Sequence, residues 1–122
     1  MQTNYNLTTP KTTPAFGAIQ YDMAKDTLKA VMNSKQLGEF VQIVEKQKTN
    51  ELVDVVLFGT GKKLSANVVD NMTKLSTDNY KCTPYSQRFF EAPLSFIKRM
   101  CEKVEKRTTQ LKEIIAKEEL LK

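Results

Sequence analysis

The chain has 122 residues, which is the size of one ordinary domain and leaves little room for a second hydrophobic core. Hydrophobic residues make up 40% of the sequence and charged residues 27%, so neither a fibrous chain nor a globally disordered one is expected. Histidine is absent, which excludes imidazole metal ligands and Ser-His or Cys-His catalytic pairs. We therefore expect no enzyme, no catalytic or metal site, no cofactor and no small-molecule substrate.

Charge and cysteine content indicate the cellular setting. The net charge is +5, and the segment 92–122 is the most basic part, with eight basic and five acidic side chains. Cys82 and Cys101 have no further cysteine or histidine to complete a zinc set, so both are expected to be free thiols in a reducing compartment. The polar start of the chain has no signal-peptide core, and no run of 18 apolar residues occurs. The sequence predicts an intracellular, cytoplasmic protein with no membrane partner.

Residues 1–20 are predicted to form an extended N-terminal arm. They are rich in Thr and Asn, contain no acidic residue, and show neither a helical nor a strand period over their first 13 positions. Pro10 and Pro14 favour extended backbone at the residues before them. Tyr5 and Phe16 are the apolar residues through which this arm would bind a partner protein or the domain itself.

Two short helices are expected next, over residues 22–33 and 34–48. In the first helix Asp22 is the predicted N-cap, and the apolar stripe consists of Ala24, Leu28, Val31 and Met32. In the second helix Ser34 is the predicted N-cap, and the stripe consists of Leu37, Phe40, Val41 and Val44. Both stripes indicate core packing.

A β-hairpin is predicted over residues 52–69. Two strand-like runs, rich in β-branched residues, flank the segment 59–62. A register that pairs Val55 with Ala66 places Val53, Leu57, Leu64 and Val68 on the same face, which is the predicted core face. A phosphate-binding loop is rejected because the glycines are two positions apart and a strand, not a helix, follows.

The segment 79–83 can add a third strand to the hairpin, ended by Pro84. Phe89 and Phe90 follow as a strongly apolar pair, which we interpret as a plug at the end of the domain. From Pro93 the sequence predicts one helix to the end of the chain, with apolar residues at alternating spacings of three and four, from Leu94 to Ile115.

The sequence therefore predicts an α+β fold. It consists of the extended N-terminal arm, two short N-terminal helices, a β-hairpin that either stands alone or extends to a three-stranded antiparallel sheet, and a long C-terminal helix. The single domain covers residues 21–110. Residues 111–122 form a projecting end of the last helix, because so long a helix exceeds what a small domain covers; folding back onto the core is the alternative for this end.

Two functions of different class follow from these features. The first is a non-catalytic protein-interaction or accessory subunit that docks through its arm and its C-terminal helix, on another protein or on a second copy of itself. Its interaction residues would be Tyr5, Phe16, Leu111, Ile114, Ile115 and Leu121. The alternative is a small basic protein that contacts a nucleic-acid phosphate backbone. Its contact residues would be Lys62, Lys63, Lys81, Lys98, Lys103 and Lys106.

Overall fold

The computed structural model describes residues 19–71 and 80–121. Within these residues it confirms the predicted α+β fold, with three α-helices and one four-stranded mixed sheet. The elements in chain order are β2 (Ile19–Gln20), the 3-10 helix η1 (Asp22–Ala24), α1 (Lys25–Val31), α2 (Ser34–Gln47), β3 (Val53–Thr60), β4 (Lys63–Asp70), β5 (Cys82–Ser86) and α3 (Pro93–Leu120).

The sheet has the strand order β2-β3-β4-β5, so it contains one strand more than predicted. The extra strand is β2, which consists of the last two residues of the predicted arm and pairs in parallel with β3. A run of two residues is too short to show a strand period in a sequence. The third predicted strand is present as β5, and it continues through Pro84. An edge strand tolerates proline because its missing N–H can face away from the sheet.

The hairpin of β3 and β4 forms as predicted, but the predicted register is wrong by two residues. Val55 lies opposite Val68, and Leu57 lies opposite Ala66. The turn consists of Gly61 and Lys62, and Gly61 has a φ of 61°, which a two-residue hairpin turn requires at its first position. A shift of two residues keeps every side chain on its predicted face, because the side-chain period of a strand is two.

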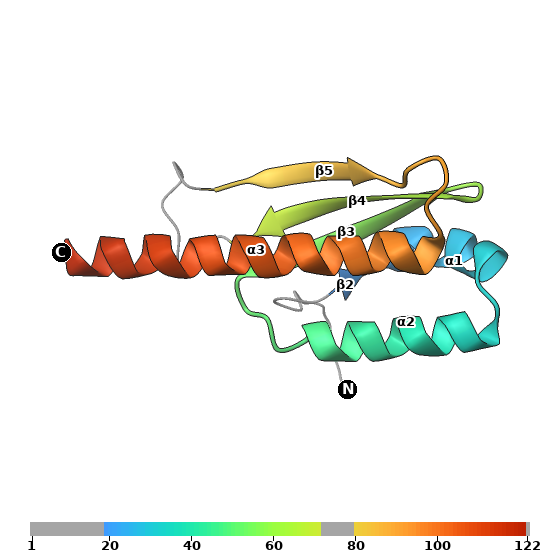
Figure 1. Cartoon of the computed structure of the whole chain (residues 1–122), viewed down its shortest axis with the longest axis horizontal. Helices are drawn as coiled ribbons and strands as arrows, with labels where there is room; N and C mark the ends of the chain where they lie inside the picture. Colours follow the sequence, from blue (N-terminus) through green and yellow to red (C-terminus); the bar gives the residue numbers. More distant parts are fainter. Residues whose placement is uncertain (1–18, 72–79, 122) are drawn as a thin grey trace, which may run out of the picture.

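The helices cover one face of the sheet, so the molecule has two layers (Figure 1). The core lies between these layers, and the predicted core face of the hairpin is buried. From α3 the core receives Phe96, Ile97, Met100, Val104 and Leu111. The side chains on the other face of β3 and β4, such as Val56 and Asn67, are partly exposed. The described part of the sheet therefore has one covered face and one open face.

The helix α1 lies very close to the hairpin turn. The Oγ1 atom of Thr27 donates a hydrogen bond of 2.9 Å to the carbonyl oxygen of Gly61. Gly59 faces the same helix, and a Cβ atom at this position would lie 2.2 Å from Oγ1 of Thr27. Glycine is therefore required at position 59 for close approach, whereas at position 61 it supplies the backbone conformation of the turn.

The two predicted helix caps differ from those observed. Asp22 makes no capping bond, because η1 precedes α1 and the chain is already turning at this point. The cap of α2 is Asn33, one residue before the predicted Ser34. Its side chain accepts a hydrogen bond of 2.9 Å from the N–H of Gln36, whose own side chain accepts one of 2.9 Å from the N–H of Asn33. This reciprocal pair is a capping box, with Asn in place of the commoner Ser or Thr.

The helix α2 lies at the margin of the core. Phe40 is buried, and its ring meets that of Tyr21 edge to face at 5.4 Å. Val41 is 55% exposed, so its predicted place in the buried stripe is wrong. A helix at the margin of a two-layer domain buries a narrower stripe than one that lies under the sheet.

The helix α3 is fixed to the sheet by an ion pair between Asp70 and Arg107. Arg107 donates two hydrogen bonds to the Asp70 carboxylate, of 2.9 Å from Nε and 2.6 Å from Nη2. The side chains of Asp70 and Arg107 are 1% and 11% exposed. Removal of either partner would leave a charge without its partner in a largely dry position, which is strongly unfavourable.

Candidate docking surfaces

The interaction residues predicted on α3 have different surroundings. Leu111 is completely buried and belongs to the core, so the core extends further along α3 than the predicted boundary at residue 110. Ile114 is partly buried against this core. Leu121 is 84% exposed, as is its neighbour Leu120. Tyr5 and Phe16 lie outside the described residues. The predicted docking surface on α3 therefore begins after Leu111.

A groove lies beside the exposed end of α3. It has a volume of about 620 Å³ and runs between α3 and the loop that joins α2 to β3. Ile115, Thr108 and Lys112 line it from α3, and Leu52 from the loop. We term this groove, together with Ile115, Leu120 and Leu121, the helix-end surface. The end of α3 extends past the sheet and the other helices (Figure 1).

The lysines predicted to contact nucleic acid do not form one patch. Lys62 and Lys63 lie at the hairpin turn, whereas Lys81 precedes β5 and its backbone bonds to Asp70 at the other end of β4. The eight residues of β4 separate these two positions by about 23 Å. On α3, Lys103 lies over the ring of Tyr85, 5.7 Å from its centroid, while Lys98 and Lys106 are exposed. A continuous phosphate track is therefore not evident among them.

The most exposed aromatic side chains of the described residues are Phe89 and Phe90. They lie in the loop between β5 and α3 and are 89% and 94% exposed, so the predicted plug is wrong. The two rings meet edge to face, with centroids 4.4 Å apart. Lys62, Lys63 and Arg88 line a shallow hollow beside Phe89. We term these five residues the aromatic tip.

The loop that carries the aromatic tip is fixed to the hairpin through Gln87. The N–H of Gln87 donates to the carbonyl oxygen of Leu64 at 3.0 Å, and its side-chain oxygen accepts from the N–H of Leu64 at 2.9 Å. Its side-chain amide also donates to the carbonyl oxygen of Glu91 at 2.6 Å. One side chain thus joins both ends of the loop to β4.

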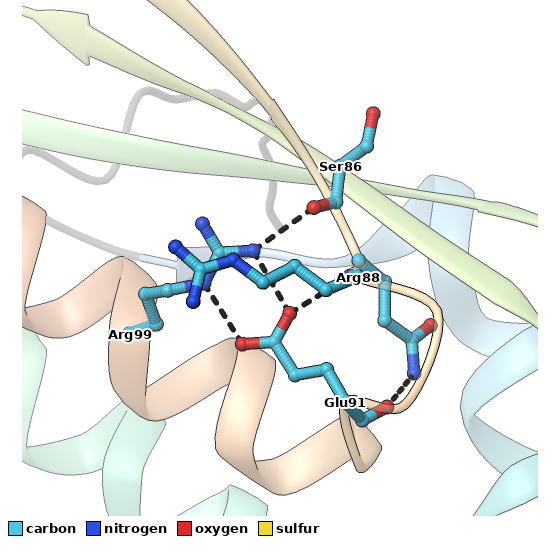
Figure 2. A network of polar contacts seen from close by, with 5 residues as sticks. Ser86, Arg88, Glu91 and Arg99 are labelled. Carbon is cyan, nitrogen blue, oxygen red and sulfur yellow. Dashed lines mark hydrogen bonds and ion pairs between the residues drawn. The ribbon is translucent and has the colours of Figure 1, made fainter.

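A second set of bonds, centred on Glu91, fixes the same loop to α3 (Figure 2). The Glu91 carboxylate accepts two hydrogen bonds of 2.8 Å from Arg99 and one of 2.9 Å from the N–H of Arg88. Arg99 also donates to the carbonyl oxygen of Ser86 at 2.9 Å. The bonds from Arg99 hold the pKa of Glu91 at about 2. The carboxylate is therefore ionised at neutral pH and its charge is balanced by Arg99.

The aromatic tip was missed as a site in the sequence because an apolar pair is usually part of a core. The available signal was its position: two consecutive aromatic residues stand between Arg88 and Glu91, in the short segment before Pro93. Neighbouring residues in a short loop cannot all point into a core, because such a loop lies on the surface.

The two cysteines are free thiols, as predicted. Cys82 is exposed on β5, and Cys101 is half-buried on α3. Burial raises the pKa of the Cys101 thiol to about 11, which keeps it protonated and unreactive at neutral pH. Within residues 19–71 and 80–121, no three side chains of the Cys, Asp and Glu types gather in a way that could hold a metal ion.

No protein-family model, curated protein or solved structure matches this chain. In the described part of the chain no helix combines the length and apolarity needed to cross a membrane. The helix-end surface and the aromatic tip are therefore the two candidate sites of the described residues.

Proposed function

We propose that this protein is a non-catalytic docking subunit that binds a partner protein, or a second copy of itself, through the helix-end surface. The observation that carries this proposal is the exposure of Leu120 and Leu121, each 84% exposed, on a helix that extends past the body of the molecule. Adjacent leucines on a helix end are ordinarily covered, because apolar area in contact with water is unfavourable.

The groove beside α3 supports the same proposal. The groove reaches Glu119, the residue before Leu120, so a partner bound at the end of α3 could also enter it and contact Ile115 and the loop residue Leu52, which line it. These apolar side chains would form the buried centre of an interface, with Lys112 and Glu119 at its rim. An interface of this composition depends on buried apolar area, so we expect it to be only weakly sensitive to salt.

The test compares the tagged wild-type chain with a Leu120→Ser, Leu121→Ser variant. Proteins captured from the native source are identified by mass spectrometry, and self-association is measured by sedimentation velocity. We expect the variant to lose the captured partner or the self-association and to keep its circular dichroism spectrum. Met23→Ser is the matched control, because Met23 is also exposed, at 61%, but lies in η1.

Identical partners and identical sedimentation for both chains would contradict the proposal. Partner binding that is lost on addition of salt but is retained by the leucine variant would instead favour the nucleic-acid alternative, since counterion release makes such binding strongly salt-dependent.

A further inference from the structure

We propose that the aromatic tip is a membrane-docking site, which inserts Phe89 and Phe90 into the boundary between headgroups and acyl chains of an anionic bilayer. This proposal concerns a different surface from the helix end and does not depend on the function proposed above. Three properties of the tip carry it: exposure on a fixed loop, local positive charge and the relative orientation of the two rings.

The first property is the exposure of two large apolar side chains on a loop that cannot withdraw them. The bonds of Gln87 to Leu64 and of Glu91 to Arg99 fix the loop at both ends. Phe89 and Phe90 remain 89% and 94% exposed. A bilayer boundary can surround such protruding rings without a preformed pocket, and binding strength then follows the apolar area that is buried.

The second property is charge. Lys62, Lys63 and Arg88 line the hollow beside Phe89. Within the described residues none of these three cations forms an ion pair, although the charge of Arg88 contributes to the low pKa of Glu91. The Glu91 carboxylate itself is balanced by Arg99. The tip therefore presents a local excess of positive charge around the two rings. Anionic headgroups attract each cation near the membrane surface.

The third property is the ring geometry, which favours a bilayer over a nucleic acid. The planes of Phe89 and Phe90 are inclined by 79°, with centroids 4.4 Å apart. Successive bases that stack on aromatic side chains present their flat faces to the rings. Two neighbouring rings at nearly right angles cannot both stack on adjacent, parallel bases of one strand. The fluid boundary of a bilayer imposes no such condition.

The expectation of no membrane partner came from the absence of a long apolar run, but a loop that inserts two side chains needs no such run.

The aromatic tip and the C-terminal end of α3 lie at opposite ends of the long axis of the molecule (Figure 1). The 28 residues of α3 span about 42 Å. Docking at the tip would thus leave the helix-end surface free, away from the membrane.

The first experiment measures co-sedimentation of the full chain with vesicles. The vesicles contain either phosphatidylcholine alone or equal parts of phosphatidylcholine and phosphatidylserine. We expect binding to the anionic vesicles, and a Phe89→Ser, Phe90→Ser variant should bind about a hundredfold more weakly. A Lys62→Gln, Lys63→Gln variant should bind roughly thirtyfold more weakly, in a salt-dependent manner. The matched control is Leu120→Ser, Leu121→Ser, which removes two exposed apolar side chains at the other end and should bind like the wild type.

The second experiment uses the absence of tryptophan from the chain. A Phe89→Trp variant contains a single tryptophan at the tip, and its fluorescence emission should shift to the blue when the anionic vesicles are added. A Met23→Trp variant places the reporter on η1 and should show no shift.

Three results would overturn the proposal. The wild type does not bind anionic vesicles, or the two serine substitutions at the tip leave its binding unchanged, or the emission of the Phe89→Trp variant does not shift. Binding of a polyuridine oligonucleotide that requires Phe89 and Phe90, without binding of vesicles, would also overturn it and assign the tip to single-stranded nucleic acid. Loss of the helix-end interaction would affect none of these measurements.

Discussion

Gly59 is the position at which α1 approaches the sheet most closely, and we expect little tolerance of substitution there. In Gly59→Ala the new Cβ would lie 2.2 Å from Oγ1 and 2.5 Å from Cβ of Thr27, a buried residue that is tied to Gly61 by a hydrogen bond. The helix must move or the Thr27 bond must break. We expect the free energy of unfolding, measured by urea denaturation, to fall by about 1–3 kcal/mol.

Gly38 provides the matched control for this prediction. It lies inside α2, and nothing lies within 4 Å of a Cβ built at this position. Gly38→Ala should therefore raise the free energy of unfolding by about 0.5–1 kcal/mol, because alanine has the higher helix propensity and loses less backbone entropy on folding. A change of the same sign in both variants would contradict the close approach at Gly59.

Glu91 gives the fold a dependence on pH. Its pKa is about 2 in the folded protein, well below the ordinary value of 4.5, because Arg99 donates hydrogen bonds to the carboxylate. A group whose pKa is lower in the folded state stabilises the fold above its ordinary pKa and loses this effect as the pH falls toward its folded-state pKa. At neutral pH, Glu91→Gln should lower the free energy of unfolding by about 2 kcal/mol.

The measurement is urea denaturation of wild type and variant at several pH values. The difference between them should shrink as the pH falls from about 5 to 2, because the wild type loses its carboxylate there. Glu113→Gln is the control: Glu113 is exposed on α3 and makes no ion pair with the described residues, so this substitution should change little. A difference that stays constant down to pH 2 would exclude the Glu91 carboxylate as its source.

At the scale of the element, the hairpin allows a direct test of its two faces. Val55 is 2% exposed and packs in the core, whereas its neighbour Val56 lies on the open face and is only partly buried. Val55→Asp should prevent folding, because it places an unpaired carboxylate in the core. Val56→Asp should leave a folded protein with a smaller loss of stability. Circular dichroism and urea denaturation measure both, and equal damage would show that the open face is covered.

The elements with a strong period could be predicted from the sequence. The faces of β3 and β4 and the extent of α3 are confirmed because a core imposes a period of two on a strand and of 3.6 on a helix. The register was wrong because two-residue turns at 60–61 and at 61–62 are compatible with the same alternation; the structure pairs Thr60 with Lys63 and so places the turn at Gly61 and Lys62. The strand β2 has no local signal, since its two residues form a strand only by pairing with β3.

The candidate surfaces could be predicted only in part. The sequence predicts one helix that carries Leu111, Leu120 and Leu121, but it does not show at which residue this helix leaves the core. The packing of the core decides this, because it buries Leu111 while the two last leucines stay exposed. The exposure of Phe89 and Phe90 depends on Gln87, whose partner Leu64 lies 23 positions away in the sequence, and on Glu91, whose partner Arg99 lies on the following helix.

At the scale of the whole molecule, we expect folding to require α3 beyond residue 110, where the sequence predicted the domain to end. The Asn50 side chain donates a hydrogen bond of 2.8 Å to Oγ1 of Thr108, and Leu111 is completely buried. Deletion of residues 108–122 removes both, and the loss of a buried leucine alone costs about 2–5 kcal/mol. We expect this truncated chain to be unfolded or strongly destabilised in circular dichroism and urea denaturation.

A shorter deletion, of residues 117–122, is the control for this prediction. It keeps Thr108, Leu111 and Ile115 and removes the exposed leucines, so the chain should remain folded with a nearly unchanged urea midpoint. A well-folded chain that ends at residue 107 would show that the core does not need the second half of α3.

The edge of the sheet at β5 has a consequence for solubility. The hydrogen bonds of Lys81 and Gln87 with β4 show that the odd-numbered residues here face β4, so the backbone groups of Cys82, Pro84 and Ser86 point outward. Pro84 has no N–H, and Arg99 occupies the carbonyl oxygen of Ser86. A strand of another molecule therefore finds fewer free backbone groups at this edge, which disfavours edge-to-edge growth of the sheet through β5.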